Sequence, residues 1–255
     1  MTPPYATPQK VTSLDECAFY QTIELPGYGV QRGAWDLRSG IDEYLGPIDY
    51  AGKRVLEIGT ANGFVCFELE SRGARVVSFD LESGLSYDII PADGLDVDQM
   101  MVEHSLGLEK VRRAFWLGHR LLDSEALVVY GHVNRLPLDL GPFDIGFVGN
   151  VLQHLENPFG AIARISRLCD TIVITESNWV TSTDQDAPSM YFLPELKRDL
   201  DPREWCFSWW QVTPGLLRTW FRVLGYQVAG PFLHKQMFLE IANEIPHFTV
   251  VARRT

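Results

Sequence analysis

The sequence predicts an α/β fold built on one open, mostly parallel sheet with helices on both faces. Strand-like apolar runs alternate with helical patterns along most of the chain, which is typical of parallel strands joined by crossover helices. Val55, Leu56 and Ile58 form a short apolar run of the kind found in a strand buried on both faces. A helix-like run over residues 64–72 separates it from a second apolar run, 74–79, so a right-handed parallel unit is expected there.

The first part of the chain is predicted to differ from the rest. Residues 1–45 are interpreted as an N-terminal arm and lid, and residues 46–255 as the main domain. Ser13, with Glu16 three residues later, is typical of the capped start of a short helix. Residues 26–40 contain four glycines and a proline, so they are predicted to form a loop.

The main domain continues the alternation of strands and helices. Spacing and apolar runs predict helices over 41–45, 98–121, 161–168 and 214–224, and strands over 126–130, 143–148, 171–175, 226–229 and 248–252. Residues 177–212 break this pattern, because they contain three prolines and four tryptophans. We predict that they form a small cap insertion over the site rather than a separate domain.

Composition narrows the function classes. An apolar share of 46% and seven tryptophans allow a sizeable core in a chain of 255 residues. The net charge of −11 argues against a nucleic-acid partner. No apolar run is long enough to cross a bilayer, and the N-terminus has no apolar signal core, so a cytoplasmic location is expected. The four cysteines show no metal-ligand spacing: Cys17, Cys66, Cys169 and Cys206.

The turn after the first strand is the most informative motif. Gly59 and Gly63 permit positive φ and leave room for a ligand against the backbone. A dinucleotide fingerprint would need a glycine at position 61, where this chain has alanine. Glu57, two residues before the first glycine, suits a cofactor with a cationic amino-acid group, and Asp80 at the tip of the second strand suits a ribose diol.

Over residues 30–255 the chain resembles the class I S-adenosylmethionine-dependent methyltransferases. Residues 55–63 are similar to the first motif of that family, and residues 143–158 are similar to its fourth strand and following helix. The resemblance implies a Rossmann-like methyltransferase fold, a seven-stranded sheet of order 3-2-1-4-5-7-6 with the last strand antiparallel, and S-adenosylmethionine as cofactor. The implied cofactor-binding residues are Glu57, Gly59, Thr60, Ala61, Gly63, Asp80, Leu81, His132, Val133 and Asn150.

Two positions depart from the pattern of the resembling family. His132 stands where an aspartate would meet the adenine amino group, so the adenine contact is open, although the Val133 amide could still serve. A related branch holds a divalent ion with a Glu-x-x-Glu-His pattern, and the matching positions here are Asn150, Gln153 and His154. Because hard cations prefer charged oxygen ligands, we predict no metal.

His154 and Glu176 are the candidate catalytic residues. His154 follows the fourth predicted strand, near the strand ends where parallel sheets place their ligand crevice, and an imidazole can accept a proton near neutral pH. It could instead line the pocket without proton transfer, or be structural. Glu176 ends the fifth predicted strand, where it could bind an acceptor amine or orient His154; a solvated strand end is the alternative.

Aromatic residues supply the candidate acceptor site. Trp179, Trp209 and Trp210 could form an aromatic wall for the acceptor, although tryptophans also serve as core anchors. From the N-terminal side, Tyr28, Trp35 and Arg38 could close over the cofactor or simply pack on the sheet edge.

These patterns predict a methyltransferase that acts on a small-molecule acceptor, by O- or N-methylation, in secondary metabolism. The acidic chain and the aromatic-rich cap favour a small, partly apolar acceptor over RNA. Three alternatives stay open: an RNA-modifying methyltransferase, an NAD-dependent oxidoreductase, and a non-catalytic partner that keeps the cofactor. A homodimer is an open option for the assembly.

Overall fold

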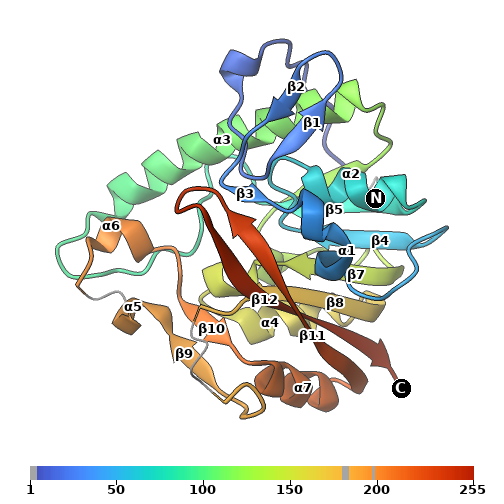
Figure 1. Ribbon diagram of the computed structural model, residues 1–255, viewed down its shortest axis with the longest axis vertical. Helices are drawn as coiled ribbons and strands as arrows, with labels where there is room; N and C mark the ends of the chain where they lie inside the picture. Colours follow the sequence, from blue (N-terminus) through green and yellow to red (C-terminus); the bar gives the residue numbers. More distant parts are fainter. Residues whose placement is uncertain (1–4, 180–183, 197–198) are drawn as a thin grey trace.

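An eight-stranded sheet organises the chain in the computed structural model, which describes residues 5–179, 184–196 and 199–255 (Figure 1). The strand order is β3-β11-β12-β8-β7-β4-β5-β6. The strands are β3 Trp35–Asp36, β4 Arg54–Ile58, β5 Arg75–Asp80, β6 Leu127–Tyr130, β7 Phe143–Gly149, β8 Cys169–Ser177, β11 Tyr226–Phe238 and β12 Asn243–Arg254. From β8 to β6 all pairs are parallel, whereas β12 is antiparallel to both of its neighbours. The predicted order and the antiparallel last strand are confirmed, with β3 as an additional edge strand.

The central strands are buried because helices cover both of their faces. On β4, Val55 and Leu56 are fully buried, and they point to opposite faces of the sheet. Full burial of an aliphatic side chain contributes about 1.5–3 kcal/mol, which explains why such runs carry a strand signal. The sheet therefore separates two hydrophobic cores, one on each face.

Among the described residues, five helices pack on these two faces (Figure 1). Helices α1 Ile41–Leu45, α2 Phe64–Ser71 and α3 Val97–Leu121 contribute to one core, and α4 Pro158–Ile165 and α7 Pro214–Val223 to the other. Their starts follow the expected capping chemistry: the side chains of Asp96, Asn157 and Thr213 each accept a hydrogen bond from a backbone N–H of the first turn of α3, α4 and α7, respectively. The described residues also include short 3₁₀ turns, which are η1 Leu14–Glu16, η2 Arg38–Gly40, η3 Val133–Arg135 and η4 Leu152–His154.

The last two strands form a hairpin that is much longer than the sequence suggested. Strand β11 was predicted to end at residue 229, before Gly230-Pro231, but it continues to Phe238 through an irregularity at that dipeptide. A strand can pass a proline where a bulge interrupts the ladder, so the dipeptide marks a bulge rather than an end. The second half of this hairpin extends to β3 of the N-terminal segment and includes His247 on β12.

The N-terminal segment is more ordered than a plain loop. A hairpin of β1 Ile23–Leu25 and β2 Gly29–Gln31 occupies part of the predicted 26–40 loop, and β3 pairs with β11. The predicted helix from Ser13 is only the single turn η1. The segment follows the main domain closely, since the Ala6 amide donates to the Val128 carbonyl and the Ala18 amide to the Lys110 carbonyl.

Part of the predicted 177–212 cap lies outside the described residues, namely 180–183 and 197–198. The described part contains the strand pair β9 Met190–Phe192 and β10 Trp210–Val212 and the short helices α5 Leu193–Leu196 and α6 Pro202–Trp205. It contacts the neighbourhood of the strand ends: the Trp209 amide donates to the Gln153 carbonyl, and the Ile90 amide donates to the Cys206 carbonyl. In Figure 1 these elements lie beside the sheet, next to α7 and below α3.

Candidate active site

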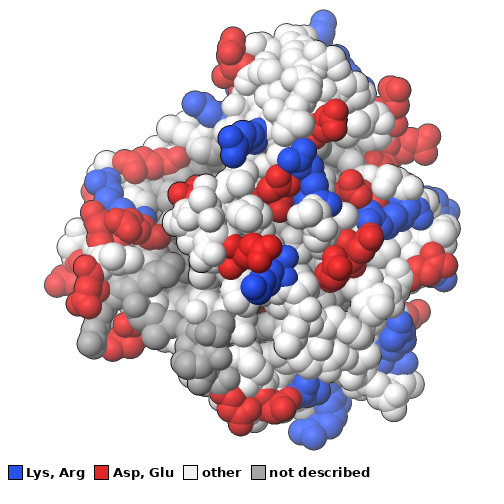
Figure 2. Space-filling model, in the orientation of Figure 1, with Lys and Arg blue, Asp and Glu red and all other residues white. Residues whose placement is uncertain are grey.

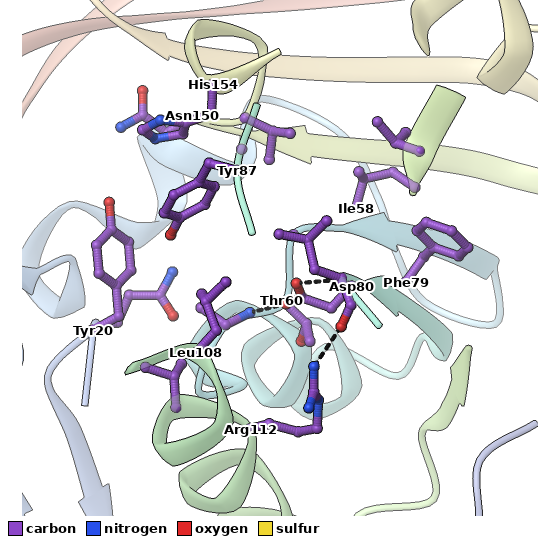
Figure 3. A pocket seen from close by; sticks show the side chains of 18 of the residues that line it. Tyr20, Ile58, Thr60, Phe79, Asp80, Tyr87, Leu108, Arg112, Asn150 and His154 are labelled. Carbon is purple, nitrogen blue, oxygen red and sulfur yellow. Dashed lines mark hydrogen bonds between the residues drawn. The ribbon is translucent and has the colours of Figure 1, made fainter. Parts of the chain in front are cut away.

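A deep cavity opens at the carboxyl ends of the parallel strands. It encloses about 1250 Å³ of empty space, open solvent at its mouth included. Residues at the tips of β4, β5, β6 and β7 line it, together with α3, the N-terminal segment and the segment that follows β5. Figure 3 shows Thr60, Asp80 and Arg112 on one side of this cavity and Tyr20, Tyr87, Asn150 and His154 on the other. The cavity lies where a parallel sheet places its ligand crevice.

The turn after β4 adopts a backbone that favours glycine at its first position. Gly59 has φ +81°, and a Cβ there would lie 2.5 Å from Val151 Cγ2. Ala61, which replaces the middle glycine of the family motif, has φ +50°, a left-handed conformation that costs about 1 kcal/mol or more for a residue with a Cβ. The Gly59, Thr60 and Ala61 backbone lines the cavity. Gly63 caps α2 outside it.

Asp80 joins the tip of β5 to this turn. Its Oδ2 accepts a hydrogen bond from the Ala61 amide at 2.7 Å, and its Oδ1 accepts one from the Leu81 amide at 2.6 Å. Burial raises the pKa of Asp80, while these amides and the nearby Arg112 charge oppose the rise. An ionised carboxylate has about four lone-pair directions, so two of them are left for a ligand in the cavity.

Arg112 completes this side of the cavity from α3. Its guanidinium donates to the Leu81 carbonyl at 2.6 Å, pairs with Glu109 and lies over the Tyr130 ring at 4.7 Å. It is buried and lines the cavity. No pattern in the sequence indicated its role, because one arginine among several on a long helix is normally expected to be solvent-exposed.

Asn62 was also missed by the sequence analysis. Its fully buried side chain accepts hydrogen bonds from the Tyr20 and Gln21 amides at 3.0 and 2.7 Å, and it donates to the Gln21 carbonyl at 3.1 Å. The cofactor-type turn thereby fixes the N-terminal segment, and both Tyr20 and Gln21 line the cavity. No local pattern could announce a contact between residues 41 positions apart.

The structure places Glu57 behind the turn, outside the cavity lining. The Ser78 hydroxyl donates to its Oε2 at 2.6 Å, and burial raises the pKa of Glu57 to about 7. Its geometry suits support of the Thr60 turn from below rather than contact with a cationic group in the cavity.

His132 and Val133 lie in the cavity lining, at the start of η3. The Nδ1 of His132 accepts a hydrogen bond from the Asn134 amide at 3.3 Å, and its Nε2 lies 3.0 Å from Asp88 Oδ1. Asp88 also lines the cavity, and its Oδ2 accepts a hydrogen bond from the Glu156 amide at 2.7 Å. A carboxylate is therefore present beside the position where the resembling family has one, but it comes from another segment.

His154 and Asn150 meet at the opposite side of the cavity. His154 Nδ1 donates to the Phe207 carbonyl at 2.6 Å, so in the neutral imidazole Nε2 is the basic nitrogen. Its ring stacks on Tyr87 with centroids 4.8 Å apart. Asn150, at φ +57°, directly follows β7, and its Oδ1 accepts a hydrogen bond from the Ser177 amide at 2.9 Å.

Glu176 does not reach the cavity. Its buried carboxylate accepts a hydrogen bond from the Leu152 amide at 2.8 Å, at the first turn of η4, and burial raises its pKa to about 8. The expectation of direct contact with an acceptor therefore does not match the geometry, and the alternative of a solvated strand end is also wrong. Glu176 therefore holds the turn η4, which also carries His154.

Aromatic and imidazole rings dominate the side of the cavity away from Asp80. Trp35 is buried and lines it, with its ring 5.3 Å from the His247 ring in an edge-to-face arrangement. Tyr20 and Tyr44 also line it. Burial lowers the pKa of His247 to about 4, so its imidazole is neutral near pH 7. We call Tyr20, Trp35, Tyr44, Tyr87, Asn150, His154 and His247 the aromatic end.

The other five predicted acceptor residues all lie outside the lining. Trp179 packs edge-on against Trp35, and the Trp209 indole donates to the Asp88 carbonyl at 2.6 Å. Trp210 belongs to β10 and packs on Phe192. Tyr28 and Arg38 lie at the surface, where Tyr28 is in the β1–β2 turn and Arg38 pairs with Asp36 at 2.7 Å.

Within the described part of the chain, no three histidine, cysteine, aspartate or glutamate side chains gather as metal ligands. Over the same residues, no helix is both long and apolar enough to cross a membrane.

Comparisons with known proteins address the fold. No family model and no curated protein sequence matches the chain. Among solved structures, the N-terminal domain of EvdMO1, crystallised in the presence of SAH and D-fucose, aligns with a TM-score of 0.55 and 17% identity over 95% of this chain and 93% of that one. The chain has a methyltransferase fold.

Two further structures share this methyltransferase fold. Magnesium protoporphyrin IX methyltransferase from Synechocystis PCC 6803, with bound SAH, aligns with a TM-score of 0.52 and 16% identity over 81% of this chain and 76% of that one. An S-adenosylmethionine-dependent methyltransferase from Mesorhizobium loti aligns with a TM-score of 0.50 and 12% identity, over 82% of this chain and 94% of that one.

The cavity of this methyltransferase fold has groups suited to the nucleoside cofactor. Asp80 and the Gly59 backbone, which both line the cavity, fit a sugar and a linked amino-acid chain. Gln21 Oε1 and Ser86 Oγ are buried, belong to lining residues and have no hydrogen-bond partner among the described residues. Because buried polar atoms are normally paired, these two indicate a polar ligand.

Proposed function

We propose that the chain is an S-adenosylmethionine-dependent methyltransferase that acts on a small, uncharged, partly aromatic acceptor. The observation that carries the proposal is one cavity lined by both the Gly59 turn and the aromatic end. In Figure 3, Thr60 and Asp80 lie on one side of it, and Tyr20, Tyr87, Asn150 and His154 lie on the other. The first side suits the nucleoside and the second suits an acceptor. Secondary metabolism is the proposed setting.

The residues of the turn side would hold the cofactor. Asp80 would accept the ribose hydroxyls with its remaining lone pairs, at about 1.5–3 kcal/mol for a hydrogen bond to a charged group. The Thr60 backbone and Gln21 would meet the amino-acid portion, and Leu81 and Val133 would line the base. When bound, S-adenosylmethionine supplies an electrophilic methyl group on a sulfonium.

The acceptor class follows from the aromatic end. Its rings offer faces and edges for a flat apolar molecule, and its two histidines and Asn150 offer hydrogen bonds. With His247 neutral near pH 7, this imidazole presents no charge that would pair with an ionic acceptor. RNA is disfavoured because the net charge is −11, and Figure 2 shows acidic and basic side chains interspersed on the face drawn.

His154 is the proposed general base for an acceptor hydroxyl. Its Nδ1–H is held by the Phe207 carbonyl, so a proton leaving the hydroxyl oxygen would go to Nε2. Stacking on Tyr87 fixes the ring plane at the cavity wall. Glu176 is proposed as a positioning residue, since it holds the turn that carries His154.

The segments that the sequence analysis interpreted as lid and cap are proposed to exclude water. The N-terminal part contributes Tyr20 and Trp35 to the cavity, and the 177–212 part supplies the carbonyl that orients His154 and the indole that holds Asp88. A closed, dry cavity strengthens the hydrogen bonds made inside it.

Calorimetric titration with S-adenosylhomocysteine and with NADH tests the cofactor. Binding of S-adenosylhomocysteine alone supports the proposal, whereas binding of NADH alone favours an oxidoreductase. Incubation with labelled S-adenosylmethionine and a panel of neutral phenols and amines then reports methyl transfer by mass spectrometry. Cofactor binding without transfer to any acceptor would instead favour a non-catalytic partner.

His154→Gln tests the base. We expect kcat for a hydroxyl acceptor to fall about 100-fold or more, because general-base catalysis contributes about 10²–10⁴-fold. The Kd for S-adenosylhomocysteine should stay within about twofold, since His154 lies on the acceptor side. An unchanged kcat and pH profile would show that His154 lines the cavity without acting as a base.

A further inference from the structure

We propose that Asp88 recognises the adenine amino group of the cofactor and so makes this site specific for an adenine nucleoside. The inference rests on the proposed function, because it names the residue that reads the base in the same cavity. Asp88 lies in the segment after β5, where the sequence shows no periodic pattern and no motif.

His132 has no acceptor left for an amino group. Its Nδ1 accepts from the Asn134 amide, so the ring proton is on Nε2, which donates to Asp88 Oδ1. An adenine base presents an N–H₂ donor at its 6-position. A protonated Nε2 would oppose that donor, and the imidazole therefore acts on Asp88 rather than on the base.

Asp88 is placed to accept the amino group. Asp80 and Asp88 are the acidic side chains among the described residues that line the cavity, and Asp80 belongs to the sugar side. Asp88 bridges the segments that follow β6 and β7, through His132 and the Glu156 amide. A base that extends from a sugar at the tip of β5 towards β6 would reach this carboxylate.

The carboxylate of Asp88 keeps both charge and free lone pairs. Burial would raise the pKa of Asp88, but the hydrogen bonds from His132 and the Glu156 amide outweigh it, so the pKa lies below its ordinary value. Two of about four lone-pair directions are used. The side chain is 21% exposed, so it is neither sealed in the core nor fully solvated.

Neighbouring contacts hold Asp88 rigidly in this position. The Trp209 indole donates to the Asp88 carbonyl at 2.6 Å, and two residues later the Ile90 amide donates to the Cys206 carbonyl. Both partners come from the 177–212 segment. A preorganised acceptor of this kind rejects an analogue that lacks the matching donor, because the carboxylate would be left unpaired.

The test compares S-adenosylhomocysteine with its deaminated analogue, S-inosylhomocysteine, in which a carbonyl oxygen replaces the amino group. We expect the wild-type protein to bind the adenine compound at least about tenfold more tightly, in line with a hydrogen bond to a charged group. Calorimetry measures both Kd values. Equal affinity of the wild-type protein for the two compounds would overturn the proposal without any variant.

The Asp88→Asn variant sharpens the comparison. An asparagine amide can donate to the carbonyl of the inosine base, so the ratio of the two Kd values should fall towards one. If the substitution only loosened the segment, binding of both compounds would weaken equally and the ratio of the two Kd values would stay the same. An unchanged ratio would therefore contradict the assignment of Asp88. Asp93→Asn, an exposed aspartate of the same segment outside the lining, is the matched control and should keep the wild-type ratio.

The two levels of the proposal fail in different ways. If the wild-type protein binds neither compound, the proposed function itself is wrong. If it binds S-adenosylhomocysteine but does not discriminate, or discriminates equally after Asp88→Asn, only the role of Asp88 is wrong.

Discussion

The two sides of the cavity are built in different ways. The turn side comes from neighbouring pieces of the parallel sheet, with Gly59 after β4 and Asp80 at the end of β5. The aromatic end is assembled from Tyr20, Trp35, Tyr87 and His247, which are scattered over most of the chain. The difference teaches that neighbouring strands can place one side of a cavity, while the other side depends on segments that lie far apart in the sequence.

The largest expected effect is on the turn side. Gly59→Val should weaken S-adenosylhomocysteine binding more than about 100-fold, because the position has φ +81° and an added Cβ would lie 2.5 Å from Val151. Gly52→Val is the control: it has φ +70° with open space around it, so it brings similar backbone strain away from the cavity. Calorimetry and thermal unfolding of both variants separate ligand exclusion from instability. Equal binding by the Gly59→Val and wild-type proteins would show that the turn has only a structural role.

Asp80→Ala should weaken S-adenosylhomocysteine binding about tenfold or more, through loss of a charged acceptor. The variant also removes the acceptor of the Ala61 and Leu81 amides, so Asp80→Asn is needed beside it, since that variant keeps an oxygen but no charge. Kd values from calorimetry check the order wild type, Asn, Ala. A Kd that is the same in all three proteins would remove Asp80 from the ligand site.

Glu57 should give the turn a pH-dependent stability. Its pKa is raised to about 7 by burial, so between about pH 4.5 and 7 the folded state keeps a proton that the unfolded state has lost. That contribution to stability is complete below the unfolded pKa and is lost as pH rises through about 7, at up to about 1.4 kcal/mol per pH unit.

Urea unfolding of wild type and Glu57→Gln at several pH values measures this contribution. The free-energy difference between the two proteins should change in favour of Glu57→Gln as pH rises from 5 to 8. Glu82→Gln, at an exposed position, should run parallel to wild type. A constant difference between wild type and Glu57→Gln would show that Glu57 is ionised throughout this range.

The smallest expected effect is a change in the KM for an acceptor when the aromatic end is altered. Trp35→Phe should raise KM for an acceptor about two- to tenfold, because an aromatic contact is worth about 0.5–1.5 kcal/mol, with Kd for S-adenosylhomocysteine unchanged. Trp210→Phe, at a tryptophan outside the cavity lining, is the control for a general effect of the substitution. A change in cofactor affinity with an unchanged KM would contradict the division of the cavity into two sides.

The sequence predicted what local patterns encode. The buried run of β4, the glycine turn and the acid at the end of β5 lie within 27 residues, and each leaves a trace in composition or spacing. The strand order, which the resemblance to the methyltransferases implied, was confirmed. The predicted strand boundaries were less accurate where residues that usually end a strand form an irregularity within it, as at Gly230-Pro231 inside β11.

Residues that depend on tertiary contacts were missed or misplaced. Asn62 and Asp88 owe their roles to partners 41 and 44 or more positions away. Glu176 was interpreted as a residue of the rim, but a hydrogen bond from the Leu152 amide stabilises it in the interior. Trp179 and Trp209 do support the site, yet from behind its wall rather than on it.

The buried amide of Asn62 has a kinetic consequence. It ties the turn that we propose to hold the nucleoside to the Tyr20–Gln21 backbone, and Tyr20 belongs to the aromatic end that we propose for the acceptor. A nucleoside that orders the turn on binding would therefore also order part of the aromatic end. We expect an obligatory sequence of substrate addition, in which the nucleoside enters first and the molecule to be modified second.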